Sequence, residues 1–436
     1  MWFRSTRSDK PLVSFRDAVL TALPPDGGLY VPDKAMDIRQ LSLYMNEETS
    51  FPDLVAAITP SLLEGDINPC SASRIAESAF NFEPELIRLD DNYSILNLYN
   101  GPTGLFKDFG IAFLAAALEE LQKNSVHTLV LAAIRGDTGV SAAHAFRGRK
   151  GISVVLVYPS GPIRGLDPAA YVTNGGNIIP IQIKGTFDDC QRLINGTIND
   201  RVFAARYNIT SANTINPGRL LPQTFYYLYA FIKLKKRISG DLVFSVPCGN
   251  FGNLIAGLYA WKFGMPVNGF IAAMNANNAL GDFIGGKPFV PRPLINTQSR
   301  ALDVSIPSNL SRLESFYREA PAVMRNMVHP ASIDDECTLR AMEQAWKKYR
   351  LHIDPHTAVA FAAAEQSAAT EGRGSHTVIL ATGHYAREAE LVRRATGEAI
   401  PEQFKLLQKK TDPIAIISPD LDAFEGALVS CLFPLM

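Results

Sequence analysis

Runs of valine, isoleucine and leucine recur along this chain at intervals that leave room for a helix between them. Such runs occur at residues 127–134, 152–158, 177–183, 241–246 and 376–382. Continuous apolar runs with helix-length spacers are typical of parallel strands in a sheet that helices cover on both faces. The chain is therefore expected to adopt an α/β fold with two doubly wound units.

The pattern divides the chain into three consecutive parts. Residues 1–90 are more helical and less regular, and are expected to form an N-terminal segment. A smaller α/β unit is expected at residues 91–235, and a larger one at residues 236–436. No internal repeat or low-complexity segment marks a linker between them.

Composition limits the classes of function. The 436 residues are 47% hydrophobic with a formal net charge of −1, so no charge imbalance favours nucleic acid or an anionic membrane as a partner. No apolar run approaches the length of a membrane span, and the amino-terminal stretch lacks the apolar region of a signal peptide. We therefore expect a cytoplasmic protein. Its expected partner is a small molecule, and it is expected to be a monomer or a homodimer.

The cysteines and histidines argue against disulfides and metals. The five cysteines are scattered and form no C-x-x-C pair, which fits a reducing compartment and neither a disulfide framework nor a structural zinc site. The seven histidines show no H-E-x-x-H pair, so no catalytic metal is expected. Cys248 is expected to be a buried thiol rather than a nucleophile.

One lysine stands at an unusual position. The segment NGPTGLFKDFG (100–110) places Lys107 after a Gly/Pro-rich turn, at the start of an apolar run that predicts a helix. A cation there faces the positive end of the helix dipole, and Leu105 and Phe106 are apolar, so the surroundings are expected to disfavour the ammonium form. An amine that attacks an aldehyde has to be unprotonated. A surface lysine without a role is the alternative that this segment alone leaves open.

A glycine-rich loop follows the run at residues 241–246. Glycines at a strand-to-helix junction allow a sharp turn, after which consecutive N–H groups and the helix N-terminus form an anion cradle. The loop contains no lysine or arginine and matches neither the P-loop nor the dinucleotide fingerprint. Unless it is a turn without a ligand, it is expected to hold a phosphate through Gly249, Asn250, Phe251, Gly252 and Asn253.

Two further strand ends carry polar groups. Thr138 and the flanking amides at residues 136–139 are suited to a carboxylate, and Thr382 presents a hydroxyl after the last apolar run. Ligands of open α/β sheets gather outside the carboxyl ends of the strands. A phosphate loop, a carboxylate loop, a hydroxyl and a helix-opening lysine together describe a pocket for pyridoxal phosphate and an amino-acid substrate.

These segments resemble the threonine synthase family of fold type II pyridoxal-phosphate enzymes over nearly the whole chain. The matching stretches are PDGGLYVP (25–32), GPTxxFKDF (101–109), GDTG with AHAF (136–146), SANTIN (211–216) with Arg219, SVPCGNFGNL (245–254), ALDVSIPSN (301–309), PHTAVAF (355–361) and LATGH (380–384). The combination of GPTxxFKDF with GNFGN is highly specific. The resemblance implies a fold like that of the tryptophan synthase β subunit.

The resemblance also implies a role for each part of the site. Lys107 is expected to form the Schiff base with pyridoxal 5′-phosphate and to move protons on the substrate. The glycine-rich loop is expected to bind the cofactor phosphate, and Thr382 to face the pyridine nitrogen. The substrate carboxylate is expected at Gly136, Asp137, Thr138 and Gly139. Arg219 is a candidate for gripping the substrate phosphate, with a structural arginine as the alternative.

The implied reaction converts O-phospho-L-homoserine and water to L-threonine and phosphate, but the chain departs from the family pattern on the substrate side. Asn100 replaces the usual histidine, Arg135 replaces the usual serine, and residues 162–169 with Arg164 replace a polar stretch. A buried arginine is costly unless it meets an anion, so Arg135 is expected to meet a carboxylate such as Asp137 or a charged substrate group.

Two alternatives to threonine synthesis therefore stay open. One is a related enzyme that acts on another phosphorylated or substituted amino acid, for example a phospho-lyase giving 2-oxobutyrate. The other is a non-catalytic protein that keeps the fold.

Several other polar residues near these motifs are expected to be structural. His144 is expected to pack near its loop, and His356 to be a helix-start histidine in a satisfied hydrogen bond. Tyr226, Tyr227 and Tyr229 lie at helical spacing and are expected to pack or to meet a partner surface.

Overall fold

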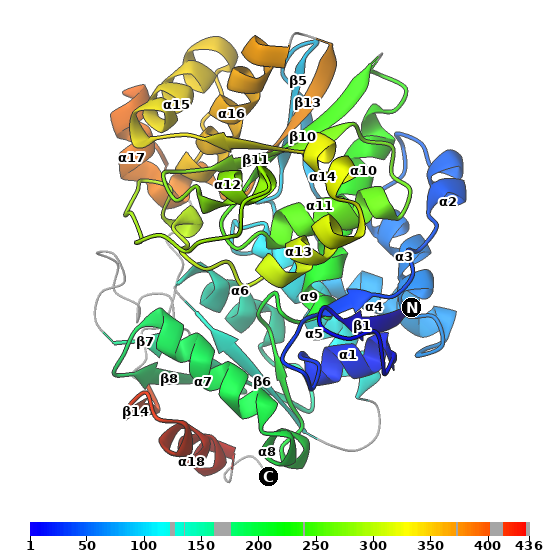
Figure 1. Ribbon diagram of the computed structural model, residues 1–436, viewed down its shortest axis with the longest axis vertical. Coiled ribbons are helices and arrows are strands. Elements are labelled where there is room, and N and C mark those ends of the chain that lie inside the picture. Colours follow the sequence, from blue (N-terminus) through cyan, green and yellow to red (C-terminus); the bar gives the residue numbers. More distant parts are fainter. Residues whose placement is uncertain are drawn as a thin grey trace.

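The computed structural model describes residues 1–122, 127–134, 136–160, 176–238, 240–371, 374–401 and 413–432. Two open sheets lie one above the other in the view of Figure 1, and a small N-terminal sheet lies beside them. The helices are packed around these sheets, so the strands form the interior of each unit.

Among the described residues the larger sheet has six strands, in the order β12-β11-β10-β13-β5-β4. Neighbouring strands are parallel except for β4, which is antiparallel to β5. The strands are β4 (Glu85–Arg88), β5 (Tyr93–Asn97), β10 (Asp241–Pro247), β11 (Gly269–Met274), β12 (Val328–Ser332) and β13 (Ser375–Ala381). β5 and β11 are buried along their whole length, as expected for strands covered on both faces.

The smaller sheet has five described strands, all parallel, in the order β14-β8-β7-β6-β9. They are β6 (Thr128–Ala133), β7 (Ile152–Pro159), β8 (Ile178–Ile183), β9 (Ile209–Ser211) and β14 (Ala415–Ile417). Helices α6 (Asp137–Phe146) and α7 (Phe187–Asn199) pack against β6 and β7, and α18 (Leu421–Leu432) packs against α7.

The N-terminal part joins a small antiparallel sheet to short helices. Its elements are β1 (Trp2–Ser5), β2 (Val13–Ser14), β3 (Tyr30–Pro32), α1 (Phe15–Thr21), α2 (Arg39–Tyr44), α3 (Phe51–Leu62) and α4 (Pro69–Ala79). Ser14, Ser50 and Asn68 cap α1, α3 and α4 by accepting a backbone N–H of the first turn. The predicted helical character of this region is confirmed, with the small sheet as an addition.

Helix α5 (Lys107–Leu121) packs against α4 of the N-terminal part and against α6, which covers the smaller sheet. Its side chains from Asp108 to Leu118 are buried, and a helix that is apolar on every side is a core helix. Phe109 on α5 makes edge-to-face contacts with Phe51 and Phe82, with ring centroids 5.4 and 5.0 Å apart. These contacts attach the N-terminal part to the helix that begins at Lys107.

Further helices connect or cover these layers. They are α8 (Arg201–Arg206), α9 (Pro217–Leu220), α10 (Thr224–Leu234), α11 (Gly252–Lys262), α12 (Ala279–Ile284), α13 (Leu310–Glu319), α14 (Pro321–Met327), α15 (Asp335–Tyr349), α16 (Pro355–Glu371) and α17 (Ala389–Thr396), with short 3-10 helices η2 (Leu221–Gln223), η3 (Arg300–Leu302) and η4 (Tyr385–Glu388). Helices α11 and α16 pack against β10 and β11 of the larger sheet.

The predicted α/β class with two wound sheets is confirmed, and the five apolar runs form β6, β7, β8, β10 and β13. Two strands cross the predicted unit boundaries: β5 follows residue 91 but pairs with β13, and β14 follows residue 236 but pairs with β8. The chain leaves the larger sheet after β5 and returns to it at β10. Which sheet β5 and β14 join is decided by pairing with strands that are distant in the sequence. The boundaries at residues 90 and 235 remain a proposal.

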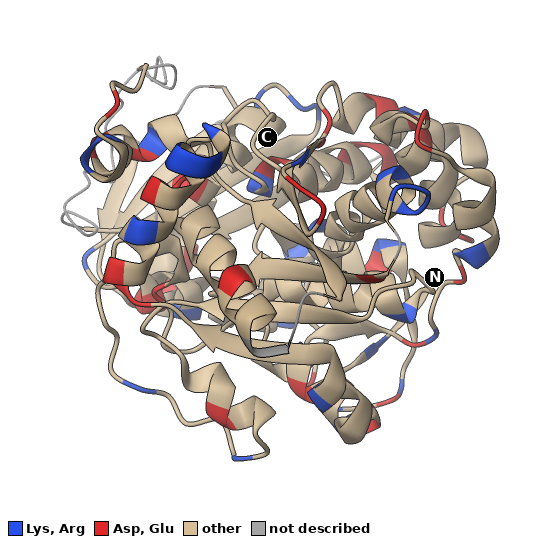
Figure 2. Cartoon of the chain, turned by 90° about the horizontal axis from the view of Figure 1, so that it is seen from above, with Lys and Arg blue, Asp and Glu red and all other residues tan. Residues whose placement is uncertain are grey.

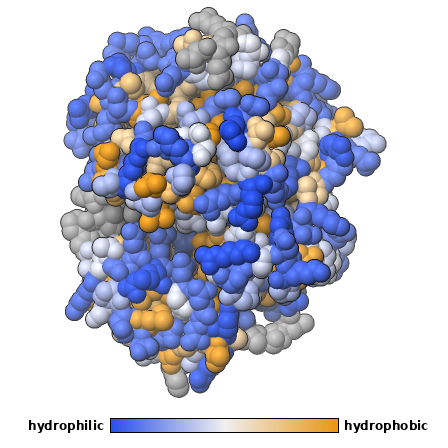
Figure 3. All heavy atoms as spheres, in the orientation of Figure 1, coloured by the Kyte–Doolittle hydropathy of each residue, from blue (hydrophilic) through white to orange (hydrophobic). Residues whose placement is uncertain are grey.

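The surface mixes charge and hydropathy. Acidic and basic residues are interspersed along the elements seen in Figure 2, and hydrophilic residues dominate the face in Figure 3, with hydrophobic ones in small groups. Within the described ranges, no helix combines the length and apolarity needed to cross a membrane. In the same ranges, no group of three or more His, Cys, Asp or Glu side chains is placed to hold a metal ion.

Candidate active site

Three neighbouring strands of the larger sheet end at one edge. β10 pairs with β13 and β13 pairs with β5, all parallel, with Ala381 at the end of β13 opposite Asn97 at the end of β5. The glycine-rich loop follows β10, Thr382 follows β13, and the segment after β5 leads to Lys107. Because the carboxyl ends of parallel strands share an edge, the three predicted cofactor elements lie next to one another.

The turn before Lys107 is tied to the loop of Thr382. Phe106 donates its backbone N–H to the carbonyl oxygen of Thr382 over 3.0 Å, and Leu105 forms an isolated bridge with Gly383. The two loops are therefore held together like a short pair of strands, and Thr382 itself is buried.

Asp108, the neighbour of Lys107, fixes the Gly-Pro-Thr turn. Its buried carboxylate accepts the Thr103 backbone N–H at 2.8 Å and the Thr103 hydroxyl at 2.6 Å. Burial raises the pKa of Asp108, and the hydrogen bonds from Thr103 oppose that effect. The Thr103 oxygen also lies 2.9 Å from the Ser141 oxygen on α6, so this network connects the two sheets beside the lysine.

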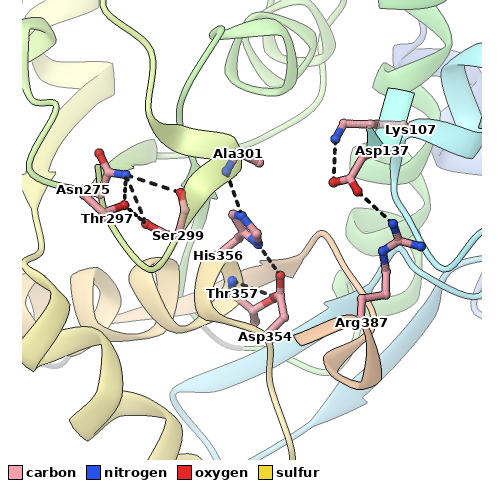
Figure 4. Close-up of polar contacts among 10 residues, drawn as sticks. All are labelled: Lys107, Asp137, Asn275, Thr297, Ser299, Ala301, Asp354, His356, Thr357 and Arg387. Atoms are coloured by element: carbon pink, nitrogen blue, oxygen red, sulfur yellow. Dashed lines mark hydrogen bonds and ion pairs between the residues drawn. The ribbon is translucent and has the colours of Figure 1, made fainter. Parts of the chain in front are cut away.

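The Lys107 amine, at the start of α5, faces Asp137, at the start of α6. The Nζ atom lies 3.2 Å from Asp137 Oδ2, and Arg387 on η4 donates to Asp137 Oδ1 over 2.8 Å (Figure 4). Arg387 also donates to the carbonyl oxygen of Thr103 over 2.9 Å. The lysine, the carboxylate loop and the loop after β13 thus meet in one cluster.

This geometry corrects one expectation from the sequence. The Lys107 side chain, 16% exposed, does not face only apolar groups and a helix end, because the Asp137 carboxylate pairs with its ammonium form. Burial disfavours the charged form of Asp137, but the charges of Lys107 and Arg387 and the hydrogen bond from Arg387 outweigh it and hold the pKa of Asp137 well below its usual range. Asp137 is therefore an anion that pairs with the Lys107 amine in this conformation.

The glycine-rich loop presents a row of free backbone donors. Among the described residues, the N–H groups at positions 249 to 253 have no hydrogen-bond acceptor. Phe251 adopts a left-handed conformation with φ of 59°, which turns the chain into α11. A Cβ at Gly249 would lie 2.9 Å from the Ala301 carbonyl oxygen, so glycine is required there. Successive amides at a helix N-terminus form an anion-binding site.

Asn253 adds a buried donor to this loop. Its Oδ1 accepts hydroxyl hydrogens from Tyr226 at 2.6 Å and Tyr227 at 2.8 Å, while its Nδ2 is buried without a partner in the part of the chain that the structure describes. Burial raises the pKa of both tyrosines well above their ordinary value, so they remain hydroxyl donors. A buried amide N–H without an acceptor fits the phosphate of pyridoxal phosphate.

The carboxylate loop stands at the N-terminus of α6. Gly136 caps the helix, and Asp137 and Thr138 are partly exposed in its first turn. The Gly139 amide donates to the Gly136 carbonyl over 2.8 Å, which closes the turn. His144 is exposed on α6, so the expectation that it packs was wrong. Arg135 and the stretch at residues 162–169 lie outside the described residues.

Arg219 is a buried cation in α9. It donates from Nη1 to the Ala212 carbonyl oxygen over 2.6 Å, and its Nε is buried without a partner among the described residues. Burial lowers the pKa of Arg219 to about 10, so the side chain stays charged at neutral pH. The structure gives it no contact with Lys107 or Asp137, and its role with a substrate phosphate stays a prediction.

Three residues of the cluster were not predicted from the sequence to be site residues. Arg387 and Asp354 were not singled out, and His356 was expected to make a satisfied hydrogen bond. The last expectation is confirmed, because His356 Nδ1 lies 2.5 Å from Asp354 and Nε2 accepts the Ala301 amide over 3.1 Å (Figure 4). In the sequence, the aspartate two positions before the histidine at the start of this helix could have indicated the Asp354–His356 pair.

Two other expectations are settled by burial. Cys248 is buried, and burial raises the pKa of its thiol, as expected for a thiol that is not a nucleophile. Tyr226, Tyr227 and Tyr229 are buried on α10, so packing is confirmed for all three.

Comparison with known families supports this assembly. A family model described as pyridoxal-phosphate dependent enzyme matches residues 89–383. Models of the threonine synthase N terminus and C-terminal region match residues 2–80 and 357–427. Threonine synthase of Serratia marcescens is 34% identical over 423 residues, covering 97% of each chain, and that of Escherichia coli is 34% identical, covering 95% of each.

Solved structures agree with these matches. Threonine synthase from Escherichia coli has a TM-score of 0.89 at 31% identity and covers 99% of this chain and 100% of its own. The PLP-bound threonine synthase from Brucella melitensis has a TM-score of 0.85 at 28% identity, covering 98% of both chains. With its fold, its cofactor-binding elements and its full-length relatives in agreement, the chain belongs to the threonine synthase family of fold type II pyridoxal-phosphate enzymes.

Proposed function

We propose that this chain converts O-phospho-L-homoserine and water to L-threonine and phosphate with pyridoxal 5′-phosphate as cofactor. The observation that carries the proposal is the meeting of Lys107, the free amides at 249–253 and the Thr382 loop at one edge of the larger sheet. Full-length similarity to threonine synthases supports the substrate and the products.

Each cofactor contact is assigned to a residue of this edge. Lys107 is the residue that links to the cofactor covalently, and Gly249, Asn250, Phe251, Gly252 and Asn253 hold its phosphate through backbone N–H groups and the free Asn253 amide. Thr382 would face the pyridine nitrogen of the bound cofactor. When bound, the cofactor supplies the electron sink that elimination and replacement at an amino acid require.

Lys107 and the residues around it are assigned to proton transfer and substrate binding. With the cofactor bound, the Lys107 amine would carry protons to and from the substrate carbons. The loop of Gly136, Asp137, Thr138 and Gly139 binds the substrate carboxylate at the positive end of α6. Asp137 and Arg387 hold that loop beside the lysine. Arg219 and Arg135 are proposed to bind the substrate on its phosphate side.

We also propose that the protein works in the cytoplasm on a small molecule, as a monomer or homodimer, without a nucleic-acid or membrane partner. The near-neutral net charge of −1 and the mixture of acidic and basic residues along the chain in Figure 2 support this proposal.

The function is tested by incubating the cofactor-loaded protein with O-phospho-L-homoserine. Threonine, inorganic phosphate and 2-oxobutyrate are quantified over time, in wild type and in Lys107→Ala. We expect equal amounts of threonine and phosphate from wild type and neither from the variant. Phosphate with 2-oxobutyrate but without threonine would mean that the chain is a phospho-lyase and not a threonine synthase.

A further inference from the structure

A buried pair, Asp354 and His356, connects the two loops that flank the proposed cofactor site. The Asp354 side chain is 3% exposed and that of His356 is 12% exposed. Asp354 Oδ1 accepts the backbone N–H of Thr357 over 2.9 Å and also its hydroxyl. Its Oδ2 lies 2.5 Å from His356 Nδ1, so the carboxylate is fixed at the start of α16 and orients the imidazole.

The other imidazole nitrogen acts as an acceptor. His356 Nε2 accepts the backbone N–H of Ala301 in η3 over 3.1 Å (Figure 4). A nitrogen that accepts a hydrogen bond carries no proton, so the geometry requires neutral imidazole with its proton on Nδ1. A second proton, on Nε2, would turn this acceptor into a donor and break the contact with Ala301.

The two contacts reach both sides of the cofactor site. The carbonyl oxygen of Ala301 packs on Gly249, where a Cβ would lie only 2.9 Å from it. The Asp354 carboxylate packs on Gly383, next to Thr382, where a Cβ would also lie 2.9 Å from Oδ2. The pair therefore contacts both loops: His356 supports the phosphate loop through Ala301, and Asp354 packs against the Thr382 loop at Gly383.

We propose that His356 is a positioning residue for the cofactor, which in its neutral form holds Ala301 and the residues beside it against Gly249 and in its protonated form releases them. The proposal rests on the proposed placement of the cofactor phosphate at residues 249–253. His356 does not touch that phosphate in this account, and it acts through the backbone of η3.

The acidic groups around the pair favour protonation of His356. Burial opposes the charge on His356, but Asp354, Glu388 on η4 and Asp137 on α6 together raise the pKa of His356. Cations also lie near the pair. Lys107 and Arg387 flank Asp137. Burial raises the pKa of Glu388, and the charge of Arg300 opposes that rise.

Protonation of His356 should change folding stability and cofactor affinity in opposite directions. Because the pKa of His356 is raised in the folded chain, its protonation stabilises the fold below its unfolded pKa of about 6.5, and this stabilisation is lost as pH rises through the folded value. Acidification therefore strengthens the contribution of His356 to folding while it removes the acceptor of the Ala301 amide. Affinity for the cofactor should fall without a matching loss of folding stability from this residue.

The experiment measures the dissociation constant of pyridoxal 5′-phosphate by equilibrium dialysis at about pH 8.5 and about pH 6, on either side of the imidazole range. Wild type is compared with His356→Gln, whose amide oxygen accepts a hydrogen bond but does not titrate, and with His356→Phe, which has no acceptor. His127→Gln is the matched control, since His127 bonds Ser153 in the smaller sheet.

We expect the acid-induced weakening to be about three- to tenfold larger in wild type and His127→Gln than in His356→Gln, the range for one hydrogen bond. His356→Phe should bind weakly at both pH values. An equal weakening in wild type and His356→Gln would overturn the proposal, as would wild-type affinity of His356→Phe at the higher pH.

A second variant keeps the proposal testable if His356→Phe does not fold. Asp354→Asn retains an acceptor for Thr357 but removes the charge that raises the pKa of His356. The midpoint of the pH dependence should move to lower pH, and an unmoved midpoint would count against the proposal because a purely structural role would leave it in place. Failure of wild type to bind the cofactor at any pH would instead contradict the proposed function.

Discussion

The Lys107 amine is held by one carboxylate before any cofactor arrives. Asp137 lies between two cations, with Lys107 at 3.2 Å and Arg387 at 2.8 Å. Arg387 is itself fixed by the carbonyl of Thr103, so Asp137 cannot easily move away. Lys107 has to leave this ion pair to reach an aldehyde, and the strength of the pair sets how readily it does so.

Replacing Asp137 by asparagine should speed the covalent capture of pyridoxal phosphate by Lys107. A partly exposed ion pair is worth up to about 1 kcal/mol, so we expect up to about fivefold faster capture near neutral pH. The rate is followed by absorbance and by borohydride incorporation, which do not depend on turnover. Asp188→Asn, at an exposed position on α7, should behave like wild type. A slower rate in Asp137→Asn would show that the carboxylate assists capture.

Cofactor affinity should depend more on the charge than on the size of the side chain at position 253. Asn253→Asp replaces the free buried donor with an anion and should weaken cofactor binding by about tenfold or more, since an unpaired buried charge or lost donor costs about 1–3 kcal/mol. Asn253→Ala should weaken it less. Asn199→Asp, at an exposed position, is the control for added charge. Equal affinity of Asn253→Asp and wild type in a fluorescence titration would remove Asn253 from the phosphate site.

At the scale of elements, one buried arginine joins three parts of the chain. Arg312 on α13 is fully buried and donates to the carbonyl oxygens of Tyr30, Thr214 and Ile215 and to Asn309 Oδ1. Asn309 in turn donates from Nδ2 to the carbonyl oxygen of Asn250 in the phosphate loop. The N-terminal sheet, the segment after β9 and the phosphate loop are therefore held in one arrangement.

Arg312→Met should destabilise the fold by about 3 kcal/mol or more, because it leaves several buried acceptors without donors. Burial lowers the pKa of Arg312 to about 10, so the native side chain is charged at neutral pH and its hydrogen bonds are charge-assisted. The measurement is the urea midpoint of the cofactor-free chain. Arg393→Met, at an exposed position on α17, should unfold like wild type, and an Arg312→Met midpoint equal to that of Arg393→Met would contradict this account.

Elements that depend on local sequence could be predicted, and contacts between elements could not. The strands were visible as apolar runs, and Lys107, the 249–253 loop and Thr382 were visible because each follows a strand. Arg387 and Asp137 are separated by 250 positions, and His356 and Ala301 by 55. Their contacts depend on how the two sheets face each other, which the spacing of residues along the chain does not encode.

At the scale of the whole molecule, the site lies where the two sheets meet. Lys107 belongs to the segment that leaves the larger sheet, and Asp137 opens the helix that follows β6 of the smaller one. A ligand that contacts both should make the two units unfold together. The departures of this chain from the family pattern at Asn100 and Arg135 are expected to concern the substrate side, whereas the expected cofactor-binding residues follow the ends of strands.

Cofactor binding should therefore raise the unfolding temperature. At one hundred times the dissociation constant a ligand stabilises the native state by about 2.7 kcal/mol, which is a rise of about 2–4 °C or less for a chain of this size. Pyridoxal without its phosphate should give a smaller rise at equal concentration, because it lacks the group that the 249–253 amides bind. An equal rise with both compounds, seen by scanning fluorimetry, would mean that this loop is not the anchor.

The central claim is that Lys107 binds the cofactor covalently, and borohydride reduction of the loaded protein followed by peptide mass mapping tests it most directly. The account predicts one modified site, in the peptide that contains Lys107, with no stable label in Lys107→Ala. A label on a different lysine, or undiminished labelling of the variant, would contradict it.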